Sequence, residues 1–343
     1  MQPIRLQSTR VWRAYTGGAL LGAWKGAPEQ DAHFPEDWVG SVITARNGDR
    51  PEEGLSRTVD GALLRDLIVA DPAGMLGEAH AVQHGADPAL LVKTLDAACR
   101  LAIQVHPTRE DAQRYFGSPY GKTEAWYVLA TREGGGRVYL GFREGVTREK
   151  WRALFDAQDV QGMLDCLHHI DVHAGDVFLV SGGVPHAIDA GCLIAEVQEP
   201  TDLTLRTERI SLLGHPYTDE DMHQGAGFEG LFDIFRYDGA DEAAMIARWR
   251  KEPRPVMATA GGRLDALIDS SDTPCFALHR LTVTGDFAEM QQTRYRIAIV
   301  AAGEGVLNGI PLHQGDYLFL PAAMDAPVWS GDMTVLLCEP GGG

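Results

Sequence analysis

Short apolar runs separated by turn residues dominate the hydrophobic pattern of the chain. Examples are LLVKTLDA (90–97), EAWYVLA (124–130) and GCLIAEVQ (191–198), each with Gly, Pro or Asp nearby. Runs of this length between turn residues favour buried β-strands. After residue 257 the same pattern continues, in segments such as RIAIVAAG and GDYLFLP. The sequence therefore predicts a protein built mainly of strands.

Helical periodicity is confined to a few segments. Residues 107–116 predict one helix, with Pro107 in its first turn and acidic residues early. Apolar residues at three- and four-residue steps predict helical structure through 147–170, which would carry His168 and His169. Further short helices are expected as follows: two within 61–92, around GALLRDLI and at the start of PALL, and one near 240–251.

Two segments of the chain repeat one another without gaps. GDVFLVSGGVPHA (175–187) aligns with GDYLFLPAAMDAP (315–327), since each has Gly-Asp, four apolar or aromatic residues and then a turn. This pattern resembles the second half of a cupin motif, in which a metal-binding histidine ends the segment. His186 takes that place in the first copy and Ala326 in the second. Two unrelated hairpins would also fit, because Gly-Asp turns are common, but we favour a duplication.

The predicted fold is mainly β, with two cupin barrels (double-stranded β-helices of the jelly-roll type) and helical additions. Residues 1–212 would form an N-terminal segment and a metal-binding catalytic barrel with helical insertions. Residues 213–256 would form a partly helical connection, and 257–343 a degenerate second barrel without metal ligands. A chain of 343 residues can bury the cores of two such units.

Composition narrows the classes of partner. The formal net charge of −18 argues against nucleic acid and anionic membranes, although a locally positive pocket can still take an anionic small molecule. No run is long and apolar enough to span a bilayer, and the start, MQPIRLQSTRVWRAY, lacks the apolar core of a signal peptide. Five widely spaced cysteines without a CxxC pair favour reduced thiols in a cytoplasmic protein. No pattern indicates the oligomeric state.

Four side chains have the spacing of ligands to one metal ion. They are Gln104 and His106 in LAIQVHP, Glu124 in GKTEAWYV and His186 in GGVPHAI. Gln104 and His106 are two residues apart on a predicted strand, so their side chains leave the same face. Taken singly, each of these side chains is also compatible with an ordinary position on a strand. Together, one amide, one carboxylate and two imidazoles form a site that suits zinc first among common metals, and we expect one Zn²⁺ per chain.

The same motifs carry a resemblance to a known family. IQVHP, GKTEAWY, VPHAIDAG and EPTDLTLR resemble type I mannose-6-phosphate isomerases in order and context, in the shorter bacterial form. The resemblance is dense over 11–235 and weaker over 257–340. It implies a zinc-dependent cupin enzyme of carbohydrate metabolism. Such an enzyme interconverts mannose 6-phosphate and fructose 6-phosphate through an enediol, with the four residues above as metal ligands.

The resemblance also implies roles for charged residues near these motifs. Arg206 would stabilise the developing enediolate, Glu196 is the candidate base, and Lys122 would polarise the substrate or assist proton transfer. The lesser candidates for substrate contact are Lys93, Asp202 and Arg209. Plainer roles stay open: Arg206 and Glu196 as a structural ion pair, Lys122 as a solvated lysine, and Lys93 as a buried lysine that must snorkel or find a carboxylate.

Two positions depart from the family pattern. Ala102 stands where the family usually has a hydroxyl that helps to hold the phosphate, and Leu212 stands where a basic residue is common. Arg209 is a possible substitute for that cation. We therefore keep open an isomerase of a free or differently substituted sugar, and a non-catalytic regulatory cupin that binds sugar or metal. Nothing in the KTE motif or around Arg206 favours a third alternative, an iron-dependent cupin oxygenase.

Overall fold

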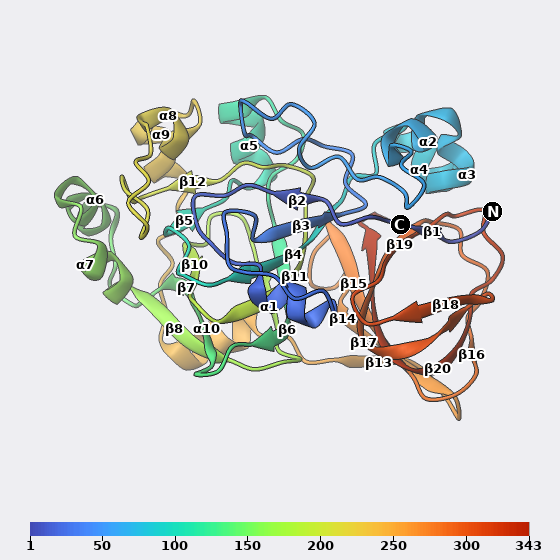
Figure 1. Ribbon diagram of the computed structural model, residues 1–343. Helices are drawn as coiled ribbons and strands as arrows, with labels where there is room; N and C mark the ends of the chain where they lie inside the picture. Colours follow the sequence, from blue (N-terminus) through green and yellow to red (C-terminus); the bar gives the residue numbers. More distant parts are fainter. Residues whose placement is uncertain (343) are drawn as a thin grey trace.

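The computed structural model describes residues 1–342, which form three sheets and ten helices. In Figure 1 the sheets of the first two thirds of the chain occupy the centre and left. The C-terminal strands, orange to red, form the right-hand part. The predicted mainly β class is confirmed.

Two sheets built from the first two thirds of the chain pack face to face. The six-stranded sheet has the order β2 (Arg10–Val11), β3 (Glu36–Val39), β4 (Leu91–Ala97), β11 (Cys192–Gln198), β6 (Glu124–Thr131), β9 (Val177–Val180). The five-stranded sheet has the order β12 (Leu205–Arg206), β5 (Gln104–Val105), β10 (His186–Ile188), β7 (Gly136–Phe142), β8 (Leu167–Val172). One apolar cluster joins Leu95, Trp126 and Ile194 of the first sheet to Val138 and Leu140 of the second. The two sheets therefore enclose a common apolar core.

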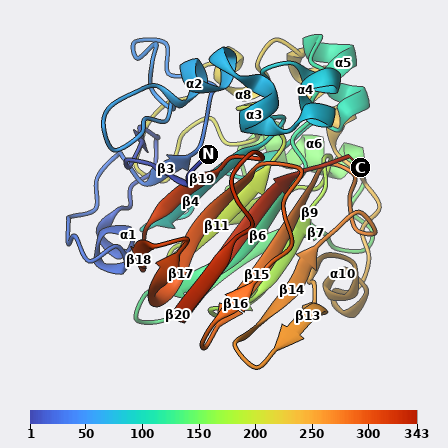
Figure 2. The same cartoon turned by 90° about the vertical axis from the view of Figure 1, so that its right-hand side faces the viewer.

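The third sheet contains the C-terminal strands and also the first strand of the chain. Its order is β1 (Ile4–Arg5), β19 (Tyr317–Leu320), β17 (Arg296–Leu307), β20 (Val328–Pro340), β15 (Phe276–Val283), β14 (Gly262–Ile268), β13 (Arg254–Thr259), with β16 (Phe287–Ala288) on β20 and β18 (Ile310–His313) on β17. Val92 and Leu193 of the six-stranded sheet pack with Ile297 and Phe319 of this one. Figure 2 shows the red strands lying over the green ones.

The strand register repeats between the two halves. Glu124 on β6 pairs with Val180 on β9, and Arg296 on β17 pairs with Leu320 on β19. Val180 and Leu320 are equivalent positions of the two Gly-Asp segments, so Arg296 occupies the place of Glu124. This shared register supports the predicted duplication, and an arginine in a ligand position fits the expected loss of metal binding. The division into two cupin barrels with the predicted boundaries stays a prediction.

The helices agree only in part with the predictions. Their bounds are α1 (Ala19–Trp24), α2 (Leu64–Ala70), α3 (Pro72–Leu76), α4 (Glu78–His84), α5 (Arg109–Phe116), α6 (Arg148–Ala157), α7 (Val160–Asp165), α8 (Asp219–His223), α9 (Gly227–Ile234) and α10 (Glu242–Trp249). α10 confirms the helix near 240–251. Three helices stand within 61–92 where two were predicted, and PALL leads directly into β4.

Two helix predictions were wrong in their details. α5 begins at Arg109, because Thr108 forms a capping box with Asp111, so Pro107 lies outside the helix. The helical structure predicted through 147–170 is present as α6 and α7, which are separated at Gln158 by a left-handed backbone with φ of 49°, and it ends at Asp165. His168 and His169 lie on strand β8, whose side chains alternate between buried and exposed and pair with β7.

Two compositional predictions can be compared with the structure. Within residues 1–342, no helix combines the length and apolar character needed to cross a bilayer. All five cysteines are unpaired, and Cys166, Cys192, Cys275 and Cys338 are buried.

Candidate metal centre and active site

Strand pairing brings the predicted ligands together. β5 lies between β10 and β12, and Gln104 pairs with His186 on one side and Arg206 on the other. His106 follows β5, and Glu124 begins β6. Ligand atoms of His106, Glu124 and His186 all lie within 4.8 Å of one another, and all three residues are buried. The fold therefore assembles candidate ligands that are up to 82 positions apart in the chain.

The hydrogen bonds of the two histidines leave their inner nitrogen atoms without a proton. His106 Nδ1 lies 2.9 Å from Leu203 O, and His186 Nδ1 lies 2.9 Å from Val184 O, so each Nδ1–H donates to a carbonyl. The Nε2 atoms then face Glu124, at 3.2 Å from His106 and 3.4 Å from His186. Among residues 1–342, His106 Nε2 and Glu124 Oε2 are buried without a hydrogen-bond partner.

This arrangement fits a cation. His106 Nε2 and Glu124 Oε2 face one another as buried acceptors without a donor, which is costly unless a cation lies between them. Two imidazoles and one carboxylate are a set that zinc accepts. The Gln104 amide lies 3.2 Å from His186 Nε2, and turning that amide over would present its oxygen as a fourth ligand.

Burial and neighbouring charges keep these groups in the state that metal binding needs. Burial, and then the charge of Lys122, lowers the pKa of His106 to about 3. Burial also lowers the pKa of His186. Burial alone would raise the pKa of Glu124, but His106 and Lys122 beside it hold that pKa well below its usual range. Neutral imidazoles and an ionised carboxylate are the forms that bind a metal ion.

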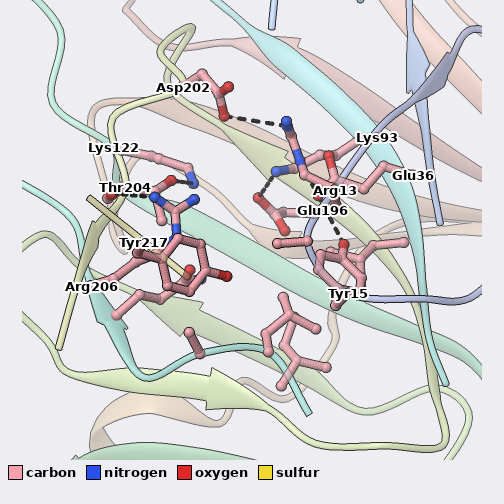
Figure 3. Close-up of a pocket in the computed structure, with 16 residues that line it drawn as sticks. Arg13, Tyr15, Glu36, Lys93, Lys122, Glu196, Asp202, Thr204, Arg206 and Tyr217 are labelled. Carbon is pink, nitrogen blue, oxygen red and sulfur yellow. Dashed lines mark hydrogen bonds and ion pairs between the residues drawn. The ribbon is translucent and has the colours of Figure 1, made fainter. Parts of the chain in front are cut away.

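A pocket opens beside the candidate metal centre (Figure 3). Its polar wall is lined by Arg13, Tyr15, Glu36, Lys93, Gln104, Lys122, Glu196, Asp202, Thr204, Arg206 and Tyr217. The remaining lining is apolar and includes Leu95, Leu101, Ala102 and Ile188. The predicted catalytic residues Arg206, Lys122 and Glu196 therefore share one cavity.

Glu196 and Lys93 form an ion pair in the pocket wall. They are register partners on β11 and β4, and Lys93 Nζ lies 3.0 Å from Glu196 Oε1. The carboxylate predicted for Lys93 is therefore Glu196, and no ion pair joins Glu196 to Arg206 in the described part of the chain. Burial, and then the charge of Glu124, raises the pKa of Glu196 to about 7 although Lys93 and Lys122 oppose this. A carboxyl group that titrates near neutrality is suited to proton transfer.

Two cations face the pocket beside this pair. Lys122 precedes β6 rather than lying on it, and its Nζ lies 3.7 Å from Glu124 Oε2 and 3.3 Å from Thr204 Oγ1. Burial, and then the charge of Lys93, lowers the pKa of Lys122. Arg206 donates to the backbone oxygens of Thr204 and Asp221, at 3.1 and 3.0 Å. Within residues 1–342 Arg206 has no ion pair with a carboxylate, so its charge is available to an anionic ligand.

Of the two remaining candidates for substrate contact, Asp202 and Arg209, only Asp202 lies in the pocket wall. Asp202 lines the pocket, where it accepts from Arg13 Nη2 at 3.3 Å and from the backbone N–H of Arg46 at 2.9 Å. Arg209 lies outside the pocket, half-exposed, with Nη1 2.7 Å from Asp219 Oδ1. Leu212 is 60% exposed and also lies outside it. The geometry therefore does not place Arg209 where it could replace a missing phosphate ligand.

Five polar pocket residues were not predicted: Arg13, Tyr15, Glu36, Thr204 and Tyr217. Arg13 donates through Nε to Glu36 Oε1 at 2.9 Å, and Tyr15 donates to the same oxygen at 2.8 Å. The signal that could have found Glu36 was a charge inside the aromatic segment FPEDW, since a carboxylate in a buried strand needs partners. No comparable signal marks Thr204, which is placed by a loop.

Comparison with known proteins agrees with this geometry. Residues 27–133 match the family described as phosphomannose isomerase type I, catalytic domain. Over this segment the chain is similar to the type I phosphomannose isomerases. The matched segment holds Lys93, Gln104, His106, Lys122 and Glu124. The mannose-6-phosphate isomerase of Streptococcus mutans is 29% identical over 251 residues, which cover 72% of each chain. The chain is therefore an isomerase, as predicted.

Solved structures of phosphomannose isomerases share this fold. The mannose 6-phosphate isomerase of Bacillus subtilis aligns with a TM-score of 0.78 and 22% identity, covering 99% of this chain and 100% of that one. A mannose 6-phosphate isomerase bound with zinc and yttrium aligns with a TM-score of 0.72 and 19% identity over 99% of this chain and 100% of that one. At these identities the likeness concerns the fold.

Proposed function

We propose that this protein interconverts mannose 6-phosphate and fructose 6-phosphate with a zinc ion held by His106, Glu124, His186 and Gln104. The observation that carries the proposal is the set of three facing acceptor atoms beside the catalytic candidates of one pocket. The names of the relatives supply the substrate. A cytoplasmic location, expected from the cysteine pattern, belongs to the same proposal.

The chemistry follows from the positions of the pocket residues. The reaction moves a proton between the first and second carbon atoms of the sugar and passes through an enediolate. A bound zinc ion would supply positive charge near the sugar oxygens. Glu196, whose pKa lies near neutrality, would take the proton from one carbon and return it to the next. Lys122 and Arg206 would stabilise the negative oxygen by charged hydrogen bonds.

The charge of the pocket supports a phosphorylated substrate. The pocket and the metal centre together hold four cationic side chains and four carboxylates. They are Arg13, Lys93, Lys122 and Arg206, and Glu36, Glu124, Glu196 and Asp202. A divalent ion would therefore leave an excess of positive charge that suits a phosphate monoester dianion.

A coupled isomerase assay tests the proposal. Zinc-loaded protein should turn over mannose 6-phosphate, and a chelator should abolish the turnover until zinc is restored. Protein that binds the sugar phosphate but never isomerises it would contradict the proposal and favour a regulatory sugar-binding cupin. The retained set of Glu196, Lys122 and Arg206 argues against that alternative, because a binding protein has no need of a proton-transfer group.

One observation favours a second candidate, an isomerase of a free or differently substituted sugar. Ala102 lies in the apolar part of the pocket wall with Leu101 and Ile188, so no hydroxyl is offered there to a phosphate. Comparable kcat/KM on mannose and mannose 6-phosphate would support this candidate, and a strong preference for the phosphate would refute it. If the enzyme does prefer mannose 6-phosphate, Ala102→Ser should lower KM for that substrate severalfold, because the serine hydroxyl adds a hydrogen-bond donor to the pocket wall.

A further inference from the structure

The loop that joins β11 to β12, residues 199–204, contacts three groups of the proposed site. Leu203 O accepts from His106 Nδ1 at 2.9 Å, which fixes the orientation of a candidate metal ligand. Thr204 Oγ1 accepts from Lys122 Nζ at 3.3 Å, and Thr204 O accepts from Arg206 Nη1 at 3.1 Å. The position of this loop therefore sets the positions of the His106 imidazole and of the Lys122 and Arg206 cations.

Asp202 attaches this loop to the N-terminal part of the chain. Its Oδ1 accepts from Arg13 Nη2 at 3.3 Å, and its Oδ2 accepts from the backbone N–H of Arg46 at 2.9 Å. Arg13 precedes α1 and Arg46 follows β3, so Asp202 meets two separate segments. Figure 3 shows Arg13 between the Asp202 carboxylate and the group around Glu36. Of these two contacts, only the one with Arg13 is between side chains.

Arg13 is itself held by a rigid strand. Its Nε lies 2.9 Å from Glu36 Oε1 on β3, and its guanidinium lies 5.5 Å from the centre of the Trp38 ring. Glu36 also accepts from Tyr15 Oη at 2.8 Å and from Trp38 Nε1 at 2.9 Å. The guanidinium is thus occupied by Glu36 and Asp202, with a weaker contact to Trp12 O. It is arranged to hold protein groups rather than substrate.

We propose that Arg13 is a positioning residue of the isomerase, which ties the 199–204 loop to β3 through Asp202 and Glu36 and so sets His106, Lys122 and Arg206. The proposal rests on the proposed function for its kinetic effect. Its structural effect, the attachment of this loop to β3 through the Arg13 guanidinium, does not depend on which sugar the enzyme takes.

The test compares Arg13→Met with Arg13→Lys and with a control, Arg296→Met. Arg296 is more deeply buried than Arg13 and forms two bonds to one carboxylate, Glu289, but lies in the third sheet. Groups that orient ligands typically contribute about 10- to 100-fold, so Arg13→Met should lower kcat by about tenfold or more with KM changed less than about threefold. Arg13→Lys should recover part of the loss, because a lysine keeps the charge but not the fork that bridges two carboxylates.

Hydrogen exchange of the full-length protein supplies a readout that does not need activity. Peptides that cover 199–204 should exchange faster in Arg13→Met and at the wild-type rate in Arg296→Met. Because Arg13 acts through Asp202, the double variant Arg13→Met/Asp202→Asn should be no slower in turnover than the slower single variant.

Several results would overturn the proposal: kcat of Arg13→Met within twofold of wild type, a change in KM alone, additive losses in the double variant, or unchanged exchange at 199–204. If the wild-type protein turns over neither sugar, the proposed function fails on its own. Faster exchange at 199–204 in Arg13→Met would then still support the role of Arg13, and unchanged exchange would refute it.

Discussion

A buried ion pair holds the strand that carries Gln104 in place. Arg100 Nη1 and Nη2 lie 2.6 and 2.9 Å from the two carboxylate oxygens of Glu208, just beyond β12. Glu208 Oε1 also accepts from the backbone N–H of Ile103 at 2.7 Å, directly before Gln104. Arg100 is 7% exposed and Glu208 2%. The pair thus joins the segment before β5 to the segment after β12.

We predict that Arg100→Met lowers the free energy of unfolding substantially. The variant keeps an apolar side chain of similar length but leaves the Glu208 carboxylate buried, with Ile103 N–H as its remaining partner. Breaking one partner of a buried pair costs about 3–5 kcal/mol, and we expect about 3 kcal/mol because the carboxylate keeps the Ile103 N–H. With an unfolding entropy of about 2 cal/mol/K per residue, this corresponds to a fall in Tm of about 4 °C.

Urea and thermal unfolding, followed by circular dichroism, would measure this loss. The double variant Arg100→Met/Glu208→Gln removes the stranded charge and keeps an acceptor for Ile103, so it should recover more than half of the stability. Arg137→Met is the control, because the Arg137–Asp171 pair is exposed and should contribute less than about 1 kcal/mol. A loss below about 1 kcal/mol for Arg100→Met, or no recovery in the double variant, would refute the reasoning, since both outcomes contradict a desolvated charge.

Three further predictions concern the metal, the base and the pH dependence of stability. Calorimetric titration should show one tightly bound Zn²⁺ per chain, and His186→Ala should weaken binding more than tenfold; unchanged affinity would place the metal elsewhere. Glu196→Gln should lower kcat by about 10²- to 10⁴-fold, the usual contribution of a general base, while zinc binding stays unchanged; near-normal turnover would exclude Glu196 as the base. Burial would raise the pKa of Glu36, but Arg13 and Lys93 hold it below its usual 4.5. A depressed pKa contributes stability that is present above pH 4.5 and is lost as the pH falls through the folded-state pKa. Unfolding free energy measured between pH 6 and 3 should therefore fall less steeply in Glu36→Gln, and equal slopes would contradict this.

Local sequence patterns were sufficient to predict the mainly β class and three candidate ligands that the structure brings together. Strand length, apolar runs and Gly-Asp turns depend on a few neighbouring residues, so the mainly β class followed from them. Gln104 and His106 were predicted to share a face because strand alternation is local. The alignment of the two Gly-Asp segments made Val180 and Leu320 equivalent, and the structure then showed Arg296 opposite Leu320 as Glu124 is opposite Val180.

Only the tertiary structure decided which charges meet. Lys93 finds Glu196 because β4 and β11 pair in one particular register, and that register depends on contacts more than a hundred residues apart in the chain. Arg13 and Asp202 meet through a loop whose path no periodicity describes. Arg209 was misplaced for the same reason: three residues beyond Arg206 the chain has left the strand, so sequence spacing no longer indicates direction.

The strand assignment of His168 and His169 has a similar cause. Their segment continues the helical spacing of the residues before it, yet β7 offers an open edge that β8 completes with backbone hydrogen bonds. Pairing with β7 therefore outweighs the helical preference of this segment. Local pattern thus determined the types of element and the ligand chemistry of this protein, whereas strand partners and loop paths, which depend on distant contacts, decided the shape and charge of its pocket.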